Sequence, residues 1–365
     1  MSPDYESRPG KKWTQIVARV SKSPWLHNGY CEPGGFMPFR KNIADYVRRT
    51  RGIVCDPEDV IVTNGIQQGL TFCAELLFNP GDACFVEEPG FQPHRDALQF
   101  FGIETRPLQA ESERMVSDLR TPGTPPRGML VTPSHQYPLG KVMPVETRAK
   151  IVEWAAETGA WVIEDDYDGE LRYGGAPYPA LASIDQNRES VIYLGSFTKI
   201  IYPGFNLGYL IAPKSIARLF EGEKLLNDRH ASEVHQVILS EFIESGEYEA
   251  HTRRLKRLYE DRRETLITGV ASRLGHLGHV VPGNQGTHLT FIFDSPIDDV
   301  KLTDFMRNRF RLEIRPLSPC YQTARKLSGM ILGFAGFSSE VIAESIVSLA
   351  NGVELFFRSN NFLDS

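Results

Sequence analysis

Short apolar runs alternate with helical patterns along the first half of the chain. Apolar segments of strand length occur at residues 59–63 (DVIVT), 83–86 (ACFV), 103–107, 128–132 (GMLVT), 160–163 (AWVI), 190–194 and 207–212. Helical periodicity lies between them, at residues 67–77, 94–101 and 145–158. Because most of these runs are continuously apolar, they predict a mostly parallel α/β sheet with helices on both faces.

The pattern changes to long helices after about residue 215. Residues 248–274 show one apolar face, and the other face carries basic side chains interleaved with acidic ones. This mixture favours a solvated surface, and a nucleic-acid-binding stripe is the alternative. Alternating segments then return at THLTFIF (287–293), RLEIRPL (311–317) and GMILGFA (329–335), followed by a helix from Ser339. They predict a small α+β domain.

We therefore expect an N-terminal arm (1–35) that belongs with the small domain, a large domain (36–255) and a C-terminal small domain (256–365). The 365 residues are 41% hydrophobic and carry a net charge of -6, which is typical of a soluble globular protein and gives no general attraction to nucleic acid. No apolar run is long enough to span a membrane, and the polar N-terminus lacks a signal-peptide core. We expect a cytoplasmic protein.

The cysteines and histidines suggest no metal site. The five cysteines are an odd number, are widely spaced and contain no CxxC pair. We expect reduced thiols and no zinc.

Polar clusters follow five of the predicted strands. They are TNGIQQ (63–68), EEPGF (87–91), TPSHQYP (132–138), EDDYD (164–168) and SFTK (196–199). Ligands of open α/β sheets bind at the carboxyl ends of the strands. Each cluster alone is compatible with ordinary turn chemistry, whereas five together predict one binding site. The first also opens a helix, whose free N–H groups suit a phosphate.

Lys199 is the only charged residue in GSFTKIIYPGFNLGY (195–209). A lysine at a dry strand end has a lowered pKa and acts as an amine nucleophile, so its natural partner is an aldehyde cofactor such as pyridoxal 5'-phosphate (PLP). PLP needs a Schiff-base lysine, a carboxylate at the pyridine nitrogen, a donor at the phenolic oxygen, an aromatic lid and a phosphate pocket. The matching residues are Lys199, Asp165, Tyr167, Phe91 and, for the phosphate, Gly65, Ile66, Gln67, Ser196 and Thr198.

The chain resembles fold-type I PLP enzymes, and among them the aminotransferase-like domain of MocR/GabR-type regulators. The segments TPSHQYPLG, IEDDYDGELRY and YLGSFTKIIYPGFNLGYL carry the resemblance. It implies Lys199, Asp165 and Tyr167 as catalytic residues and Phe91 stacked on the cofactor ring. It also implies a homodimer. His135 lies in the first motif and is expected near the ring, with a structural hydrogen-bonding role as the alternative.

Three departures from that family bear on function. The regulators carry an N-terminal winged helix-turn-helix, but this sequence starts at Met1 just before the aminotransferase-like part, so we expect a free-standing enzyme. Asn206 stands where the family places a phosphate-binding arginine. The alternatives are a Lys or Arg elsewhere that replaces it, looser cofactor binding, a pocket reshaped for an unusual substrate, and neutral drift compensated by backbone N–H groups. Ser328 lies where an arginine usually holds the substrate carboxylate, which leaves Arg315, Arg325 and His288 as substrate-contact candidates.

The predicted function is a PLP-dependent aminotransferase that acts on an amino acid or amine in specialised (secondary) metabolism. One alternative is an enzyme that uses the same carbanion chemistry for β- or γ-elimination, replacement or carbon–carbon bond formation. Another alternative is a ligand-sensing domain of a MocR-type regulator.

Overall fold

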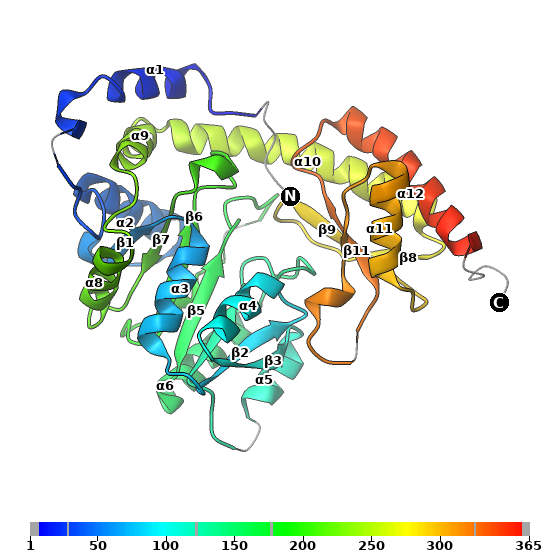
Figure 1. The fold of residues 1–365 in the computed structure, drawn as a ribbon, viewed down its shortest axis with the longest axis horizontal. Helices are drawn as coiled ribbons and strands as arrows, with labels where there is room; N and C mark the ends of the chain where they lie inside the picture. Colours follow the sequence, from blue (N-terminus) through cyan, green and yellow to red (C-terminus); the bar gives the residue numbers. More distant parts are fainter. Residues whose placement is uncertain (1–6, 28, 121–122, 176–177, 325, 360–365) are drawn as a thin grey trace.

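The structure is a computed structural model that describes residues 7–27, 29–120, 123–175, 178–324 and 326–359. Its centre is a seven-stranded sheet (Figure 1), which confirms the predicted α/β fold class. In spatial order its strands are β1 (Val60–Thr63), β7 (Gly208–Ile211), β6 (Val191–Ser196), β5 (Trp161–Asp166), β4 (Gly128–Val131), β2 (Ala83–Glu88) and β3 (Glu104–Gln109).

The sheet is parallel except at β7. The pairs β2–β3, β2–β4, β4–β5 and β5–β6 are parallel, whereas β7 is antiparallel to both β6 and β1. Residues 197–207 join β6 to β7 and contain only a short 3-10 helix, η3 (Pro203–Phe205). A parallel return needs a crossover of about a dozen residues or more, usually a full helix. This short connection therefore reverses the chain, and it carries Lys199.

Helices cover both faces of this sheet. One face packs against α3 (Ile66–Leu77), α4 (Gln92–Phe100) and α8 (Ala217–Asn227). The other packs against α2 (Met37–Arg51), α6 (Val145–Thr158), α9 (Glu233–Glu244) and the first half of α10 (Glu247–Leu274). Val162 and Ile163 are neighbours in β5 and enter opposite cores, because successive side chains of a strand alternate between faces.

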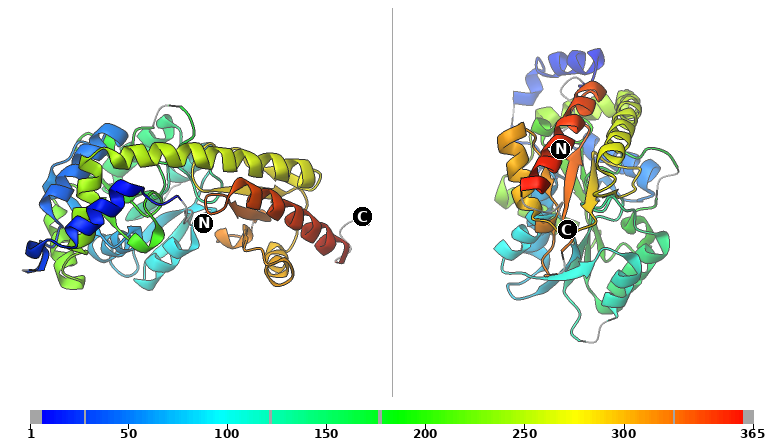
Figure 2. Two further views of the ribbon diagram at one scale, coloured as in Figure 1. Left: turned by 90° about the horizontal axis from the view of Figure 1, so that it is seen from above. Right: turned by 90° about the vertical axis from the view of Figure 1, so that its right-hand side faces the viewer.

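A four-stranded antiparallel sheet forms the smaller part of the molecule. Its order is β10 (Arg315–Pro316), β11 (Gly329–Gly333), β9 (His288–Phe293) and β8 (Gly278–Val280). It is flanked by α11 (Asp299–Phe310), α12 (Ser339–Ser359) and the second half of α10. Figure 2 shows α10 as one continuous helix that lies beside α12. This arrangement confirms the small α+β unit predicted from the C-terminal segments.

The domain boundaries stay predictions. Helix α10 continues through residue 255 and contacts elements around both sheets. The N-terminal helix α1 (Lys11–Val20) packs on α9, and the ring of Trp13 lies 5.1 Å from that of Phe242. The remaining elements are α5 (Ser112–Leu119), α7 (Leu181–Ile184), η1 (Pro24–His27), η2 (Pro57–Asp59) and η4 (Ser318–Cys320).

All five cysteines are free thiols in the structure. Among the described residues, no group of three or more Cys, His, Asp and Glu side chains is placed to hold a metal ion. Within the same residues, no helix combines the length and apolar character required to cross a membrane.

Candidate active site

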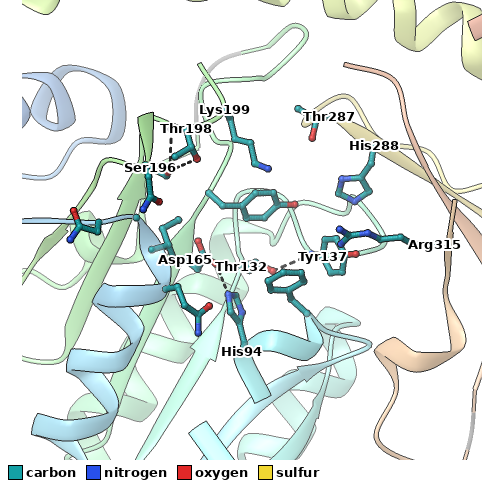
Figure 3. Close-up of a pocket in the computed structure, with 17 residues that line it drawn as sticks. His94, Thr132, Tyr137, Asp165, Ser196, Thr198, Lys199, Thr287, His288 and Arg315 are labelled. Carbon is teal, nitrogen blue, oxygen red and sulfur yellow. Dashed lines mark hydrogen bonds and ion pairs between the residues drawn. The ribbon is translucent and has the colours of Figure 1, made fainter. Parts of the chain in front are cut away.

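A cavity of about 350 Å³ lies where the carboxyl ends of the central strands meet the small sheet (Figure 3). It collects residues from all five polar clusters found in the sequence, together with residues of the small sheet. Its lining consists of Asn64, Gly65, Ile66, Gln67, Phe91, His94, Thr132, Tyr137, Asp165, Tyr167, Ser196, Thr198, Lys199, Asn206, Thr287, His288 and Arg315.

Lys199 extends from the β6–β7 connection into this cavity (Figure 3). Burial lowers the pKa of its ammonium group, and the nearby Arg315 guanidinium lowers it further, while the carboxylates of Asp168 and Asp165 oppose the shift. A lowered pKa increases the share of the neutral amine, which is the form that attacks an aldehyde.

Asp165 is held by a histidine that the sequence analysis did not predict. The Nε2 atom of His94, in α4, lies 3.1 Å from Oδ2 of Asp165. The other carboxylate oxygen, Oδ1, is buried and has no hydrogen-bond partner among the described residues. Burial raises the pKa of Asp165, and the hydrogen bond from His94 opposes that rise. The carboxylate therefore has one free acceptor for a cationic N–H group in the cavity.

Tyr167 is linked to His135, which does not line the cavity. Nδ1 of His135 lies 2.9 Å from the hydroxyl oxygen of Tyr167 and 2.9 Å from Oδ2 of Asp168. A carboxylate only accepts, so Nδ1 carries the proton in this contact. The Tyr167 oxygen can accept from the same N–H, which leaves its own hydrogen free to donate into the cavity. His135 thus orients Tyr167 from behind.

One end of the cavity is lined by uncharged hydrogen-bond donors. Gly65 precedes α3 with a φ of +82° and provides no side-chain cap, so the first N–H groups of the helix stay available. The hydroxyls of Ser196 and Thr198 lie 2.7 Å apart at the same end. A Cβ atom on Gly65 would approach Oδ1 of Asn206 to 3.0 Å, so glycine allows this close approach.

Asn206 caps η3 in the left-handed conformation, with φ +43° and ψ +51°. Asparagine tolerates this region better than most residues that have a side chain. Its amide lies against Gly65 and lines the cavity. The left-handed backbone thus explains why asparagine is favoured at position 206. The same residue lies beside the N-terminus of α3.

The opposite end of the cavity is aromatic and contains Arg315. The ring of Phe91 lies 5.0 Å from that of Tyr137, which lies 5.2 Å from the ring of His288. Arg315 reaches this group from β10 (Figure 3). Burial raises the pKa of Tyr137 to about 12, and the Arg315 charge opposes that shift.

His288 lines the cavity, as Arg315 does, whereas Ser328 and Arg325 do not contribute to the described lining. Ser328 precedes β11 and its hydroxyl accepts a hydrogen bond from the N–H of Ile297, so it does not line the cavity. Arg325 lies outside the described residues. Arg315 is accordingly the only arginine that lines the cavity in the described part of the chain.

Several lining residues were missed by the sequence analysis. His94 follows Phe91 by three residues at the start of α4, and this spacing places both side chains on one helix face. Thr132 and Tyr137 lie within a motif that had been recognised, and Thr287 precedes the β9 strand. The positions of these residues could be read in the sequence. The fold was needed to show that their side chains point into the cavity.

Comparison with known proteins places this site in a family. The family described as "Aminotransferase class I and II" matches residues 11–342. The chain belongs to this family. It is 31% identical to "Probable rhizopine catabolism regulatory protein MocR" of Rhizobium meliloti, over 95% of this chain and 70% of that protein. It is 29% identical to "Aromatic-amino-acid aminotransferase 1" of Thermococcus litoralis, over 64% of this chain and 58% of that protein.

The fold agrees with that of solved aminotransferases. The kynurenine aminotransferase of Pyrococcus horikoshii, solved with PMP, superposes with a TM-score of 0.88 at 24% identity, over 97% of this chain and 89% of that one. The aminotransferase class I and II family thus includes this chain, and the family implies PLP as its cofactor. The free Oδ1 of Asp165 and the neutral donors around Gly65 fit the two ends of that molecule.

Proposed function

We propose that this protein is a PLP-dependent aminotransferase that acts on an amino acid or amine of specialised metabolism. The observation that carries the proposal is a single cavity that contains Lys199, the free Oδ1 of Asp165 and the donors before α3. These groups match the aldehyde, the pyridine nitrogen and the phosphate of PLP. When bound, PLP supplies an electrophilic carbon for an amine and a ring that withdraws electrons from the substrate α-carbon.

The residues of this chain have distinct roles in the proposal. Asp165, oriented by His94, accepts the pyridine N–H and keeps that nitrogen protonated. The Tyr167 hydroxyl, oriented by His135, donates to the phenolic oxygen. Lys199 would hold the cofactor through its Nζ atom, and the same amine would move the proton at the substrate α-carbon as base and then as acid. The lowering of the Lys199 pKa by burial supports this role.

Phosphate binding is proposed to rest on neutral donors. They are the N–H groups of Ile66 and Gln67, the hydroxyls of Ser196 and Thr198, and the Asn206 amide. The helix macrodipole of α3 adds a partial positive charge at the same place.

Arg315 is proposed to hold the substrate carboxylate. It lies at the end of the cavity opposite the neutral donors, beside Tyr137 and His288, and no other arginine lines the cavity in the described chain. Guanidinium groups pair with carboxylates through two parallel hydrogen bonds. The arginine comes from β10 here, whereas the position before β11, where an arginine usually holds the carboxylate, is Ser328. This difference supports a specialised substrate.

The decisive experiment follows nitrogen from donor to acceptor. The purified protein with PLP is incubated with ¹⁵N-labelled amino acids and a panel of 2-oxo acids, and the products are identified by mass spectrometry. Label in a new amino acid, absent with Lys199→Ala, supports transamination. Release of labelled ammonia or formation of a carbon–carbon adduct without label transfer indicates elimination or condensation chemistry instead.

A ligand-sensing role is a second candidate, because the chain is 31% identical to a regulatory protein over 95% of its length. In that case PLP and an amine still bind at Lys199, but no product leaves the protein. Binding measured by absorbance of the cofactor, with no label transfer to any acceptor, would favour the sensor.

We also propose a cytoplasmic homodimer. Tyr30 and Leu226 are 77% and 83% exposed, and the guanidinium of Arg229 lies 4.4 Å from the Tyr30 ring centre. The neighbouring Asp228 accepts a hydrogen bond from the side-chain amide of Asn64, which lines the cavity. Exposed apolar side chains next to a cavity support a contact with a second subunit. Light scattering coupled to size exclusion tests this, with Tyr30→Ser and Leu226→Ser as disrupting changes.

A further inference from the structure

A second cavity of about 330 Å³ lies on the other side of the carboxyl end of β5. Its walls come from α2, α10, the segment that follows β5, Ser134 and Gln285. Asp165 and Asp166 are consecutive in β5 and point to opposite faces of the sheet. Asp165 lines the active-site cavity, whereas Asp166 pairs with Arg51 in the wall of this second cavity. The two cavities are therefore separate spaces that share one strand end.

The walls of the second cavity contain buried polar atoms without hydrogen-bond partners. In the described part of the chain these include Oη of Tyr248, Oε2 of Glu170, Nη1 of Arg172 and Oε1 of Gln285. Tyr248 is completely buried and Gln285 nearly so. Buried polar groups are almost always satisfied by protein or by bound molecules. Of these atoms, Oη of Tyr248 and Nη1 of Arg172 are donors, and two buried donors without acceptors around one cavity indicate that a ligand with acceptor oxygens completes the site.

Basic side chains outnumber acidic ones in this lining. Two of the five bases are matched by carboxylates: Arg51 pairs with Asp166 and Glu170, and Arg49 pairs with Glu249. The other three form no ion pair with a carboxylate within the described chain, and they are Arg172, Arg253 and Lys256. An excess of positive charge thus remains around the cavity.

The fold holds these three bases in place. Arg253 and Lys256 are three residues apart on α10 and therefore share a helix face. The guanidinium of Arg172 lies 4.2 Å from the ring centre of Tyr178, and its Nε donates to the carbonyl of Gly174. Burial lowers the pKa of Lys256, and the positive charges of Arg172 and Arg51 lower it further. The charges of Arg172 and Arg51 therefore act on Lys256 across the cavity, and the carboxylates of Glu260 and Glu170 oppose them.

We propose that the second cavity binds a small dianion, a phosphate or a dicarboxylate, between Arg172, Arg253 and Lys256. The ligand oxygens accept from the guanidinium and ammonium groups, and two negative charges offset the positive charges of the three bases. The free Nη1 of Arg172 and the hydroxyl of Tyr248 become donors to the same ligand. The segment that follows β5 links this site to Tyr167 and Asp168 of the active site.

The test is isothermal titration of the full chain saturated with PLP. Sodium phosphate and sodium succinate are the two probes, sodium acetate is the monoanion control, and sodium chloride keeps the ionic strength constant. We expect one saturable site for at least one dianion and none for acetate. Arg172→Gln and Lys256→Gln should each weaken that binding by about tenfold or more, as the loss of one charge-assisted hydrogen bond implies.

Two matched variants separate this site from other basic groups. Arg257→Gln removes an exposed base from α10 outside the cavity, and Arg315→Gln removes the base of the active-site cavity. Both should bind the dianion as the unmodified protein does. Binding that disappears in Arg315→Gln, that survives both Arg172→Gln and Lys256→Gln, or that is absent from the unmodified protein would overturn the proposal. The last outcome would mean that only water fills the cavity.

Discussion

The Nε2 atom of His94 lies 3.1 Å from Oδ2 of Asp165, while Oδ1 of the same carboxylate has no hydrogen-bond partner among the described residues. Oδ2 is thus held by a side chain of α4, and Oδ1 is available to a ligand in the cavity. Burial raises the pKa of this carboxyl group and the hydrogen bond from His94 opposes the rise, so the contact favours the anionic form that the proposed function requires.

Replacement of His94 by leucine should therefore act through Asp165. The pKa of Asp165 should rise because it loses the hydrogen bond that lowers it. We expect amino transfer to fall by about tenfold to a hundredfold, as for other groups that orient a functional residue, and the acidic limb of its pH profile to move to higher pH. His94→Gln, which keeps a donor, should restore much of the activity. Superimposable pH profiles for the three proteins would contradict the orienting role.

Lys199 should carry the covalent bond to the cofactor. Borohydride reduction followed by peptide mass spectrometry should place the added mass on Lys199. Lys199→Ala should lose that label and at least about a hundredfold to ten-thousandfold in turnover, the range of a general acid–base group. Lys214→Ala is the control, because Lys214 is exposed and pairs with Asp56 at the surface. Label on any other lysine in the unmodified protein would refute the assignment.

Arg315→Gln should raise KM for carboxylate-bearing donors. Loss of one charge-assisted hydrogen bond corresponds to about 1.5–3 kcal/mol, or roughly a tenfold to hundredfold change. Donors without a carboxylate should be affected much less, because they do not use the guanidinium. Arg309→Gln, at the exposed end of α11, serves as the control. An equal effect on both classes of donor would show that Arg315 is not the anchor.

Asn206→Arg should tighten PLP binding if Asn206 faces the phosphate. A guanidinium beside the helix N-terminus adds a charge-assisted bond, worth roughly tenfold in affinity after the cost of the left-handed backbone. Pyridoxal, which lacks the phosphate, should bind both proteins equally. The measurement is fluorescence titration of the apo-protein with each compound, and a parallel change for both would place Asn206 away from the phosphate.

Glu87 should make the protein less stable as the pH rises. Burial raises its pKa from 4.5 to about 7, although Thr132 donates two hydrogen bonds to it. Between these values the folded state holds more protons than the unfolded state, so the free energy of unfolding falls as the pH increases, and the fall ends above about pH 7.

Glu87→Gln mimics the protonated form and should remove this fall. We expect about 3 kcal/mol less difference between pH 5 and pH 8 in chemical denaturation. Glu157→Gln on the exposed surface of α6 should behave as the unmodified protein does. The same pH dependence in Glu87→Gln as in the unmodified protein would show that Glu87 is ionised throughout.

Much of the fold was predictable because local and tertiary preferences agree. The apolar runs became the strands of a mostly parallel sheet, and the long amphipathic pattern after residue 247 became α10. The reversal at β7 was not predicted, since an apolar run looks the same in either direction. The domain boundaries also depend on how α10 joins the two sheets, which periodicity does not encode.

The residues that follow the apolar strands could be recognised as a candidate site from their local sequence. Lys199, Asp165, Tyr167 and the residues before α3 follow apolar strands, and the geometry of parallel sheets brings such ends together. The side chains that complete this site come from distant segments and follow from the packing of the folded chain. His94 reaches Asp165 from another helix, His135 lies behind Tyr167, and Arg315 enters from the small sheet. Contacts between distant segments depend on the direction of each side chain and on packing. The spacing of residues along the chain predicts neither of these.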